Sequence, residues 1–475
     1  MERDNIAQID RIFHPRSIVV VGASNREGNL GRMFVEPTIQ AGFEHLYVVN
    51  PRENEVLGLK SYPSLKDIPE HLDLAIIATG AQTVPQIINE CAENGVAGAV
   101  VFTAGFSEAG EEGRKREREL VEVAHRGGIR IIGPNCVGIY CPSAKVANMW
   151  GLPTESGSVG MISQSGHFAQ IFPTVAASKG VRFSKVVSCG NESDLNAADF
   201  LEYLGHDPET KLIIGYIEGI KEGGRFFKVA RQVSMTKPIL IWRGGLSQLG
   251  TRAASSHTGA LTGSNHIWRA LCKQAGVITV NSAQELLDLV LAFHYLPLPK
   301  GKRIGIVSSP GGLAVTACDA CAEFGLSLAE FSPQVQQRLR QAIPWAGTSM
   351  KNPVDVSIVA GLAPELFLKP VQIVADNVDM IYIIGGLPNQ PFIDALVEAG
   401  KSIEKPLAVC LYPREAVTEE YLPLLRAGVA AYTDSIRGIL ALSRFADYSE
   451  FLRASLDDCQ RQNVGGQQEL GRNNE

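Results

Sequence analysis

The chain has 475 residues, of which 45% are hydrophobic and 20% charged, with 47 glycines and a formal net charge of −6. A chain of this length is too long to fold around one hydrophobic core, so we expect about two to four domains. Its composition is typical of an α/β protein. The acidic balance argues against a nucleic-acid partner, and no apolar run reaches the roughly eighteen residues of a membrane-spanning helix.

The sequence also lacks the patterns of a targeting signal and of a metal site. No hydrophobic signal region follows Met1–Asn5, so we expect a cytoplasmic protein without membrane attachment. The nine cysteines include one CxxC pair, Cys318 and Cys321, which stands alone inside a helical pattern. A zinc site would need a second pair, so we expect incidental thiols and no metal ion.

In the first third of the chain, short apolar runs alternate with amphipathic segments, which is typical of a parallel sheet wrapped by helices. Segments such as residues 84–94 and 110–127 are long enough to be the helices. This alternation predicts a doubly wound, Rossmann-like domain over residues 1–145. Its expected strands are Ser17–Gly22, His45–Asn50, Leu74–Thr79, Gly98–Thr103 and Ile129–Gly133.

The same alternation begins again twice. Two prolines and a glycine in Leu296–Gly301 indicate a linker between the two further stretches. We therefore expect α/β domains at 146–298 and 299–459, followed by a polar, disordered tail at 460–475. The expected strands are Gly157–Ser163, Phe183–Ser188, Lys211–Ile217 and Pro238–Trp242 in the second domain, and Arg303–Ser308, Met380–Gly385 and Leu407–Leu411 in the third.

A glycine-rich turn, Gly22–Gly31, follows the first expected strand and leads into a helix. Such a turn lets backbone N–H groups and the helix dipole hold a phosphate. It departs from GxGxxG, and an NAD site would favour an acidic residue after the second strand, where this chain has Pro51 and Arg52. A cation there suits the ribose phosphate of coenzyme A (CoA) better than NAD, although a glycine turn that only packs is the alternative.

Two further strand-to-helix junctions carry small polar residues. Ser163–His167 opens the second domain and Ser308–Gly312 opens the third. Such residues suit a helix N-cap and an anion site. Capping alone explains either junction, but the pair suggests two helix N-termini that face a shared phosphate.

One carboxylate and one histidine have the setting of reactive groups. Glu218 ends an apolar strand, where ligands of open α/β sheets gather, although a strand-end salt bridge is the alternative. His257 lies among small residues, with no Cys/His cluster for a metal and no GxSxG elbow in the chain for a serine nucleophile. A nucleophilic role would need a carboxylate and anion-holding amides, which Glu218 and the two helix starts could supply. A solvated loop histidine is the other reading.

Three neighbouring side chains receive lesser roles. Glu192 and Asp194 lie in an acidic loop after a strand, and we expect them to be caps rather than substrate-facing groups. His167 lies beside the Gly166 turn, where we expect it to shape a pocket rather than to act in catalysis.

Together these motifs resemble the α subunit of the NDP-forming, in particular ADP-forming, acyl-CoA synthetases of the succinyl-CoA synthetase superfamily. The resemblance runs from about residue 10 to residue 450. It implies a Rossmann-like CoA-binding domain followed by two flavodoxin-like α/β domains. The motifs that carry it are Val21–Ser24, Val49–Pro51, Ala104–Phe106, Gly133–Cys136, Ile162–Gly166, Tyr216–Ile220, Ser256–Gly259 and Asn352–Asp355.

The resemblance implies a reaction at these positions. His257 would take a phosphoryl group from an acyl phosphate, made from acyl-CoA and phosphate, and pass it to ADP, while Glu218 steadies the phosphohistidine. The implied phosphate-holding residues are Ser165, Gly166, Gly259, Gly311 and Gly312. The implied CoA-binding residues are Gly22, Ala23, Ser24, Gly28, Gly31, Pro51, Arg52, Thr79, Ala104, Gly105 and Asn135.

The chain also departs from the family pattern. Nothing after the third domain has room for an ATP-grasp domain, so the resemblance assigns ADP or ATP with Mg²⁺ to a separate ATP-grasp β subunit in a hetero-oligomer. His167 stands where a small residue is usual and Pro173 interrupts the following helix, which leaves the acyl group of the small carboxylic acid open. The alternatives are a CoA-binding sensor without catalysis and a nicotinamide dehydrogenase that binds NAD.

Overall fold

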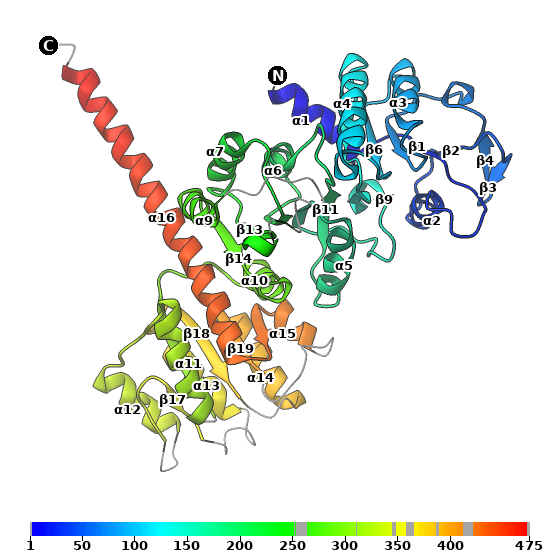
Figure 1. Cartoon of the computed structure of the whole chain (residues 1–475). Helices are drawn as coiled ribbons and strands as arrows, with labels where there is room; N and C mark the ends of the chain where they lie inside the picture. Colours follow the sequence, from blue (N-terminus) through cyan, green and yellow to red (C-terminus); the bar gives the residue numbers. More distant parts are fainter. Residues whose placement is uncertain are drawn as a thin grey trace. The chain divides into compact units, whose positions relative to one another are not determined.

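The structure is a computed structural model that describes residues 2–250, 252, 264–309, 311–343, 348–357, 365–385, 389–411 and 421–472, without the side chains of 2–3, 365–366 and 458–472. The described chain divides into two compact units (Figure 1). The first unit comprises residues 1–177 and 181–281, and the second comprises 178–180 and 282–475. The first unit holds two sheets and the second unit holds one.

The first sheet has seven strands in the order β3-β4-β2-β1-β5-β6-β7. Apart from the antiparallel pair β3 and β4, neighbouring strands are parallel. With β3 set aside this is the order 3-2-1-4-5-6 of the Rossmann fold. Figure 1 shows α3 and α4 side by side on one face. The elements are α1 Glu2–Phe13, β1 Ile18–Val21, α2 Arg32–Gln40, β2 Leu46–Val49, β3 Glu55–Val56, β4 Leu59–Tyr62, η1 Leu65–Asp67, β5 Leu74–Ile77, α3 Val84–Glu93, β6 Gly98–Val101, η2 Ser107–Ala109, α4 Glu111–Arg126 and β7 Arg130–Ile132.

The second sheet has the order β14-β13-β12-β10-β11-β8-β9. Its five parallel strands follow the flavodoxin order 2-1-3-4-5, and β8 and β9 add an antiparallel edge. The helix α5 runs through Pro173, which the sequence predicts to interrupt it. The elements are β8 Gly138–Cys141, η3 Pro142–Ala144, β9 Val146–Ala147, β10 Val159–Ser163, α5 Gly166–Ala177, β11 Phe183–Ser188, α6 Ala197–His206, β12 Leu212–Ile217, α7 Gly223–Val233, β13 Ile239–Arg243, α9 Asn265–Gln274 and β14 Val277–Val280.

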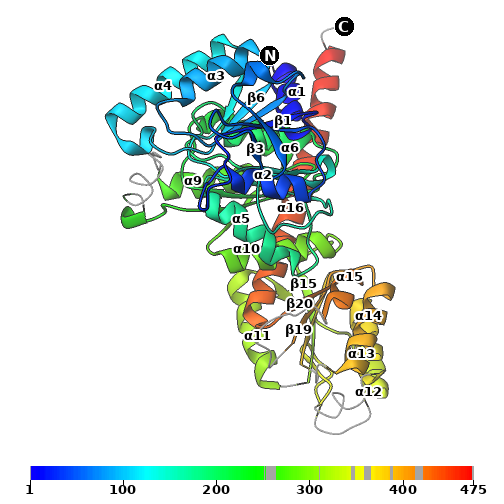
Figure 2. The same cartoon turned by 90° about the vertical axis from the view of Figure 1, so that its right-hand side faces the viewer.

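The third sheet repeats the flavodoxin order as β16-β15-β18-β19-β20, with β17 paired to β15. Figure 2 shows α12, α13 and α14 on one face and α11 and α16 on the other. The elements are α10 Ala283–Tyr295, β15 Arg303–Ser308, α11 Gly311–Phe324, β16 Ser327–Leu328, α12 Pro333–Ala342, β17 Val354–Asp355, α13 Glu365–Ala375, β18 Met380–Ile384, α14 Gln390–Ser402, β19 Leu407–Cys410, α15 Leu422–Arg426, β20 Val429–Tyr432 and α16 Ser435–Arg472. The predicted fold class, a Rossmann-like domain followed by two flavodoxin-like domains, is thus confirmed.

The element boundaries differ from the expected domain boundaries at three places. Residue 145 falls between β8 and β9, which both belong to the second sheet. Helix α10 precedes residue 298 but lies in the second unit, where it packs on α16. Helix α16 continues to Arg472, through residues for which the composition predicts disorder.

The first two sheets share one hydrophobic core, which explains why they form one unit. Helix α1 joins them, because the ring of Phe13 stacks on Tyr203 of α6 with centroids 5.1 Å apart. At the same junction, Arg130 of β7 forms an ion pair of 2.9 Å with Asp194 of the second sheet. These contacts join the two sheets within the first unit.

Candidate functional site

The carboxyl ends of strands from both sheets meet at a cavity of about 500 Å³. Ligands of open α/β sheets bind where the strand order reverses, which is beside β1 and β5 in the first sheet and beside β10 and β12 in the second. The cavity occupies this position, because residues that follow β5, β6 and β10 line it. The lining residues are Leu30, Ala78, Thr79, Phe102, Thr103, Ala104, Asn135, Cys136, Val137, Gln164, Ser165, Gly166 and His167.

Three of the predicted CoA-binding residues, Thr79, Ala104 and Asn135, line the cavity directly. Thr103 donates a hydrogen bond of 2.6 Å to the carbonyl of Thr79, and the backbone N–H of Asn135 donates one of 3.1 Å to the carbonyl of Thr103. The ends of β5, β6 and β7 are thereby fixed to one another. Gly105 lies just outside the lining, with its N–H bonded to the carboxylate of Glu108 at 2.5 Å.

The glycine turn lies beside this cavity and contributes Leu30 to its wall. Asn29 closes the turn, because its Oδ1 accepts the N–H groups of Ser24 and Arg32 at 3.0 Å each and its Nδ2 donates to the carbonyl of Gly22 at 3.1 Å. Gly31 precedes α2, and a Cβ there would lie 2.7 Å from the backbone N of Ala23. The turn is thus a closed, tightly packed loop in front of a helix N-terminus, as an anion site requires.

The remaining predicted residues of the glycine turn and the second strand surround this loop. Gly22 and Gly28 have positive φ angles of 98° and 75°. Pro51 and Arg52 are exposed, and the side chain of Asn50 ties their strand end to the carbonyl of Ala23 at 2.9 Å. The cation at position 52 therefore lies at the strand end next to the turn, as the sequence predicts.

The start of α5 forms the opposite wall. The hydroxyl of Ser165 accepts the N–H of Phe168 at 3.3 Å, so Ser165 caps the helix and leaves the first N–H groups at the wall. Gly166 and His167 line the cavity, and the His167 ring is exposed. His167 therefore contributes to the pocket wall, as the sequence predicts.

Glu218 follows β12 directly and is 6% exposed. Its carboxylate accepts a hydrogen bond of 3.2 Å from the hydroxyl of Tyr216, and burial together with this carboxylate raises the pKa of Tyr216 to about 12. Tyr216 is wedged between Trp242 and Phe168, with centroids 5.0 and 5.3 Å away. The Glu218 side chain is therefore buried and held by an aromatic cluster rather than mobile on the surface.

Two residues that the sequence analysis missed support this carboxylate: Gln164 through hydrogen bonds to its backbone, and Gly244 through the space it leaves beside the side chain. The Oε1 atom of Gln164 accepts the N–H groups of Glu218 and Gly219 at 2.6 and 3.1 Å, and its Nε2 donates to the carbonyl of Gly219 at 2.7 Å. A Cβ at Gly244 would lie 2.8 Å from the Tyr216 hydroxyl and 3.3 Å from Cγ of Glu218. The Ser-Gln-Ser-Gly turn contains Gln164, but its bond to the next strand end depends on tertiary structure and has no signal in the sequence.

Other predicted residues lie elsewhere. His257 and Gly259 lie outside the described residues. Gly311 and Gly312 begin α11 in the second unit and are exposed, with nothing within 4 Å of a Cβ at either position. Within the described parts of the chain, no cluster of three or more His, Cys, Asp or Glu residues could hold a metal ion. The same parts contain no helix with the length and apolarity to cross a bilayer.

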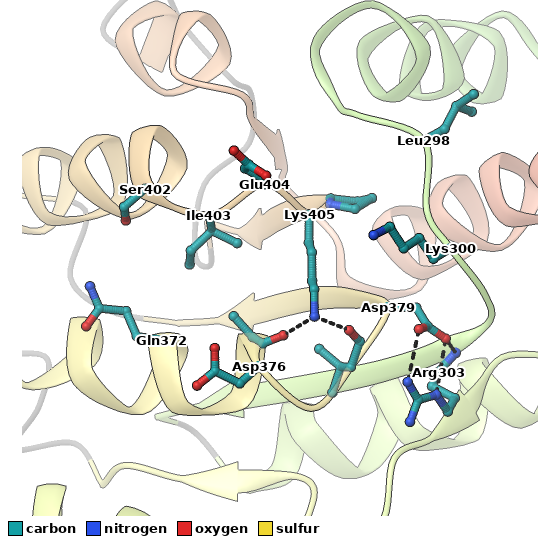
Figure 3. Close-up of a pocket in the computed structure, with 13 residues that line it drawn as sticks. Leu298, Lys300, Arg303, Gln372, Asp376, Asp379, Ser402, Ile403, Glu404 and Lys405 are labelled. Carbon is teal, nitrogen blue, oxygen red and sulfur yellow. Dashed lines mark hydrogen bonds and ion pairs between the residues drawn. The ribbon is translucent and has the colours of Figure 1, made fainter.

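A second cavity, of about 660 Å³, lies in the second unit near the amino ends of β15, β18 and β19 (Figure 3). Two of its basic groups are engaged in structure. Lys405 donates to the carbonyls of Ala375 and Val378, and Arg303 pairs with Asp379 at 3.1 Å. This edge is opposite to the one at which α/β sheets bind ligands.

Comparison with known proteins supplies two matching family models. A CoA binding domain matches residues 16–142, and a succinyl-CoA ligase like flavodoxin domain matches residues 156–293. These ranges contain the strands β5, β6, β7 and β10, whose ends form the first cavity.

Curated relatives match most of the chain. The α subunit of acetate–CoA ligase [ADP-forming] II from Pyrococcus furiosus is 39% identical over 435 residues, which cover 89% of this chain and 94% of the relative. Acetate–CoA ligase [ADP-forming] I from Archaeoglobus fulgidus is 39% identical over 445 residues, which cover 93% of this chain but 64% of the relative. The chain therefore spans nearly the whole of a separate α subunit but less than two thirds of the longer relative.

A solved structure has the same fold. The dinucleotide forming acetyl-coenzyme A synthetase 1 of Ca. Korarchaeum cryptofilum, in complex with phosphate and ADP, superposes with a TM-score of 0.86 at 31% identity. The match covers 94% of this chain and 99% of that chain.

Proposed function

Because this chain belongs to the family of ADP-forming CoA ligases, we propose that it is the α subunit of an acyl-CoA synthetase that works with a separate ATP-grasp β subunit. The reaction converts acyl-CoA, phosphate and ADP into a carboxylic acid, CoA and ATP, or runs in reverse. The observation that carries the proposal is the cavity in which the strand ends of the CoA-binding sheet meet the start of α5.

The cavity offers one wall for CoA and another for phosphate. CoA binds at the glycine turn and Arg52, and its thiol end reaches the wall formed by Thr79, Ala104 and Asn135. Phosphate binds at the N–H groups of the α5 start, where a helix N-terminus stabilises an anion. The thioester carbonyl and the attacking phosphate thus share one cavity of about 500 Å³.

The first steps follow from this placement. Phosphate attacks the thioester carbonyl, the C–S bond breaks, and CoA leaves as the thiol after taking a proton, which yields an acyl phosphate. His257 then takes the phosphoryl group and releases the carboxylate. The carboxylate of Glu218 orients the ring and stabilises its cationic phosphorylated form. Transfer to ADP with Mg²⁺ on the partner subunit completes the cycle.

The central test is phosphorylation of His257. The chain, purified with its ATP-grasp partner, should acquire acid-labile phosphate from ATP and should release ADP on addition of CoA and the correct acid from a panel of carboxylic acids. His257→Ala should abolish both while leaving CoA binding intact, and His266→Ala, on an exposed face of α9, should change neither. Full activity of His257→Ala would contradict the proposal.

Titration with CoA and NAD separates the alternatives. CoA should bind and NAD should not, because the second strand ends in Pro51 and Arg52 rather than in an acidic residue. CoA binding without any phosphorylation of the complex would favour the sensor instead.

Gly31→Ala tests the glycine turn. The added methyl group would lie 2.7 Å from backbone atoms of Ala23, so the loop must open to admit it. We expect CoA affinity to fall about tenfold, which corresponds to roughly 1.4 kcal/mol. Gly224→Ala is the matched control, because nothing lies within 4 Å of its added Cβ. Calorimetric titration with CoA measures both, and equal affinities would show that the turn does not hold the ligand.

A further inference from the structure

Asn191, in the loop between β11 and α6, connects two turns that form the CoA wall of the first cavity. It is 3% exposed and is not itself one of the lining residues. The two turns follow β6 and β7, and they carry the lining residues Ala104 and Asn135. A movement of Asn191 would therefore be passed on to the wall.

The turn after β7 is bonded to the Asn191 loop at four points. The backbone N–H of Asn191 donates to the carbonyl of Pro134 at 3.0 Å, and Nδ2 of Asn135 donates to Oδ1 of Asn191 at 3.4 Å. The N–H and the hydroxyl of Ser193 both donate to the carbonyl of Gly133 at 3.0 Å. Asn135 has a left-handed backbone with φ of 59°, which is uncommon outside glycine, and these bonds hold the turn in that conformation.

The turn after β6 is held by the carboxylate of Glu108. Its Oε1 accepts the backbone N–H groups of Gly105 and Phe106 at 2.5 and 3.0 Å, and Arg116 of α4 donates to the carbonyl of Gly105. Its Oε2 accepts Nδ2 of Asn191 at 2.5 Å. Although burial opposes it, the hydrogen bonds from Asn191 and from the two N–H groups lower the pKa of Glu108. The amide of Asn191 is thus attached to this turn through an ionised carboxylate.

The surroundings of Nδ2 of Asn191 require a hydrogen-bond donor. This nitrogen also lies 3.1 Å from Oε2 of Glu117 on α4 and 3.2 Å from the hydroxyl of Ser107. It therefore lies between the carboxylates of Glu108 and Glu117, and a third carboxylate in its place would bring like charges together. An amide supplies a donor at this end and an acceptor for Asn135 at the other, without a charge.

We propose that Asn191 is a positioning residue, whose amide fixes the two turns so that their lining residues hold the thiol end of CoA against the phosphate at the start of α5. This inference rests on the proposed function. A misplacement of about 1 Å can lower a rate about 100-fold, so a small movement of the turns is enough. The nucleotide end of CoA is assigned to the glycine turn and Arg52, to which no described hydrogen bond of Asn191 leads. The effect is therefore expected in the rate rather than in CoA affinity.

The test separates two half-reactions in the complex with the ATP-grasp partner. ATP first loads His257 with phosphate in the absence of CoA, and CoA is then added with the acid of the panel that gives the fastest ADP release in the wild type. Asn191→Ala should load His257 within about twofold of the wild-type rate but form acyl-CoA about 10- to 100-fold more slowly at saturating CoA. Its KM for CoA should stay within about threefold, because the nucleotide end still binds.

Asn196→Ala is the matched control from the same loop. Asn196 is 8% exposed and caps α6, because its Oδ1 accepts the N–H of Ala198 at 2.9 Å. Its removal should lower the thermal midpoint, as loss of an N-cap does, and leave the rate of acyl-CoA formation by the loaded complex unchanged. Equal slowing in both variants would show that Asn191 only stabilises the loop, and would overturn the proposal. A wild-type rate of acyl-CoA formation in Asn191→Ala, or an equal loss of loading, would also overturn it.

An exchange of polar groups decides the matter if Asn191→Ala does not fold. Asn191→Asp removes the donor and faces Glu108 with a second carboxylate, so it should slow acyl-CoA formation at saturating CoA. Adding Glu108→Gln provides an amide that accepts the N–H groups of Gly105 and Phe106 through its oxygen and donates to the new carboxylate through its nitrogen. The double variant should regain about tenfold in rate. A double variant as slow as Asn191→Asp would contradict the proposal, whereas absence of His257 loading in the wild-type complex would refute the proposed function.

Discussion

Glu218→Gln should slow phosphoryl transfer through His257 by about 10²- to 10³-fold, the usual effect of removing one preorganised charged group from a reacting centre. The substitution keeps the size of the side chain and a hydrogen-bond acceptor for Tyr216, which bonds the carboxylate at 3.2 Å. It removes the negative charge that would favour the cationic, phosphorylated ring. The expected loss is therefore in the rate, with little change in CoA affinity.

Rapid-quench measurement of acid-labile phosphate in the complex tests this expectation. Glu222→Gln is the matched control, because that side chain is 51% exposed and pairs only with Arg225 of its own helix among the described ion pairs. Its rate should stay within about twofold of the wild type, since exposed pairs contribute little. If Glu218→Gln phosphorylated as fast as Glu222→Gln, Glu218 would be a strand-end structural group and the role assigned to it would be wrong.

The sequence predicted the fold class because the central parallel strands are buried on both faces and so appear as apolar runs between amphipathic helices. All residues of β1, β5 and β6, for example, are buried. The short antiparallel strands β8 and β9 are not predictable in this way. They have four and two residues. Tertiary contacts decide that β8 pairs with β11 rather than with a strand of the first sheet.

The candidate site was predictable to the extent that it lies at strand ends. Glu218 and Ser165 were found because a turn follows an apolar run at each, whereas Thr79 and Asn135 were implied by the family resemblance. Gln164, which connects two of these ends, was missed because its partners, Glu218 and Gly219, follow another strand. Glu192 is another residue whose surroundings depend on the fold. The sequence favoured a cap at this position, and the structure shows that the side chain is buried.

Lys185→Met should destabilise the first unit by about 3–5 kcal/mol, because it leaves a buried carboxylate without its cation. Lys185 is 1% exposed in β11, and its ammonium bonds Asp207 at 3.0 Å and Glu209 at 2.9 Å. Asp207 is 5% exposed. Although burial opposes it, hydrogen bonds from Thr210 and Lys185 lower the pKa of Asp207. The stability from this carboxylate is therefore present above its unfolded pKa of about 4 and is lost as pH falls below that value.

Denaturant unfolding followed by the fluorescence of Trp242 and Trp268, which lie in the same unit, measures the effect. At pH 7 the variant should lose the full amount, about 3–5 kcal/mol of unfolding free energy, and the difference from the wild type should shrink below about pH 4 as Asp207 takes up its proton.

Adding Asp207→Asn to Lys185→Met should restore much of the lost stability, because no unpaired charge is then buried. The exposed lysine directly before β12 gives the control, Lys211→Met, which should stay within about 0.5 kcal/mol. A loss in Lys185→Met no larger than in that control would mean that water or a relaxed backbone already compensates Asp207, and the ion pair would not hold β11 to the following loop.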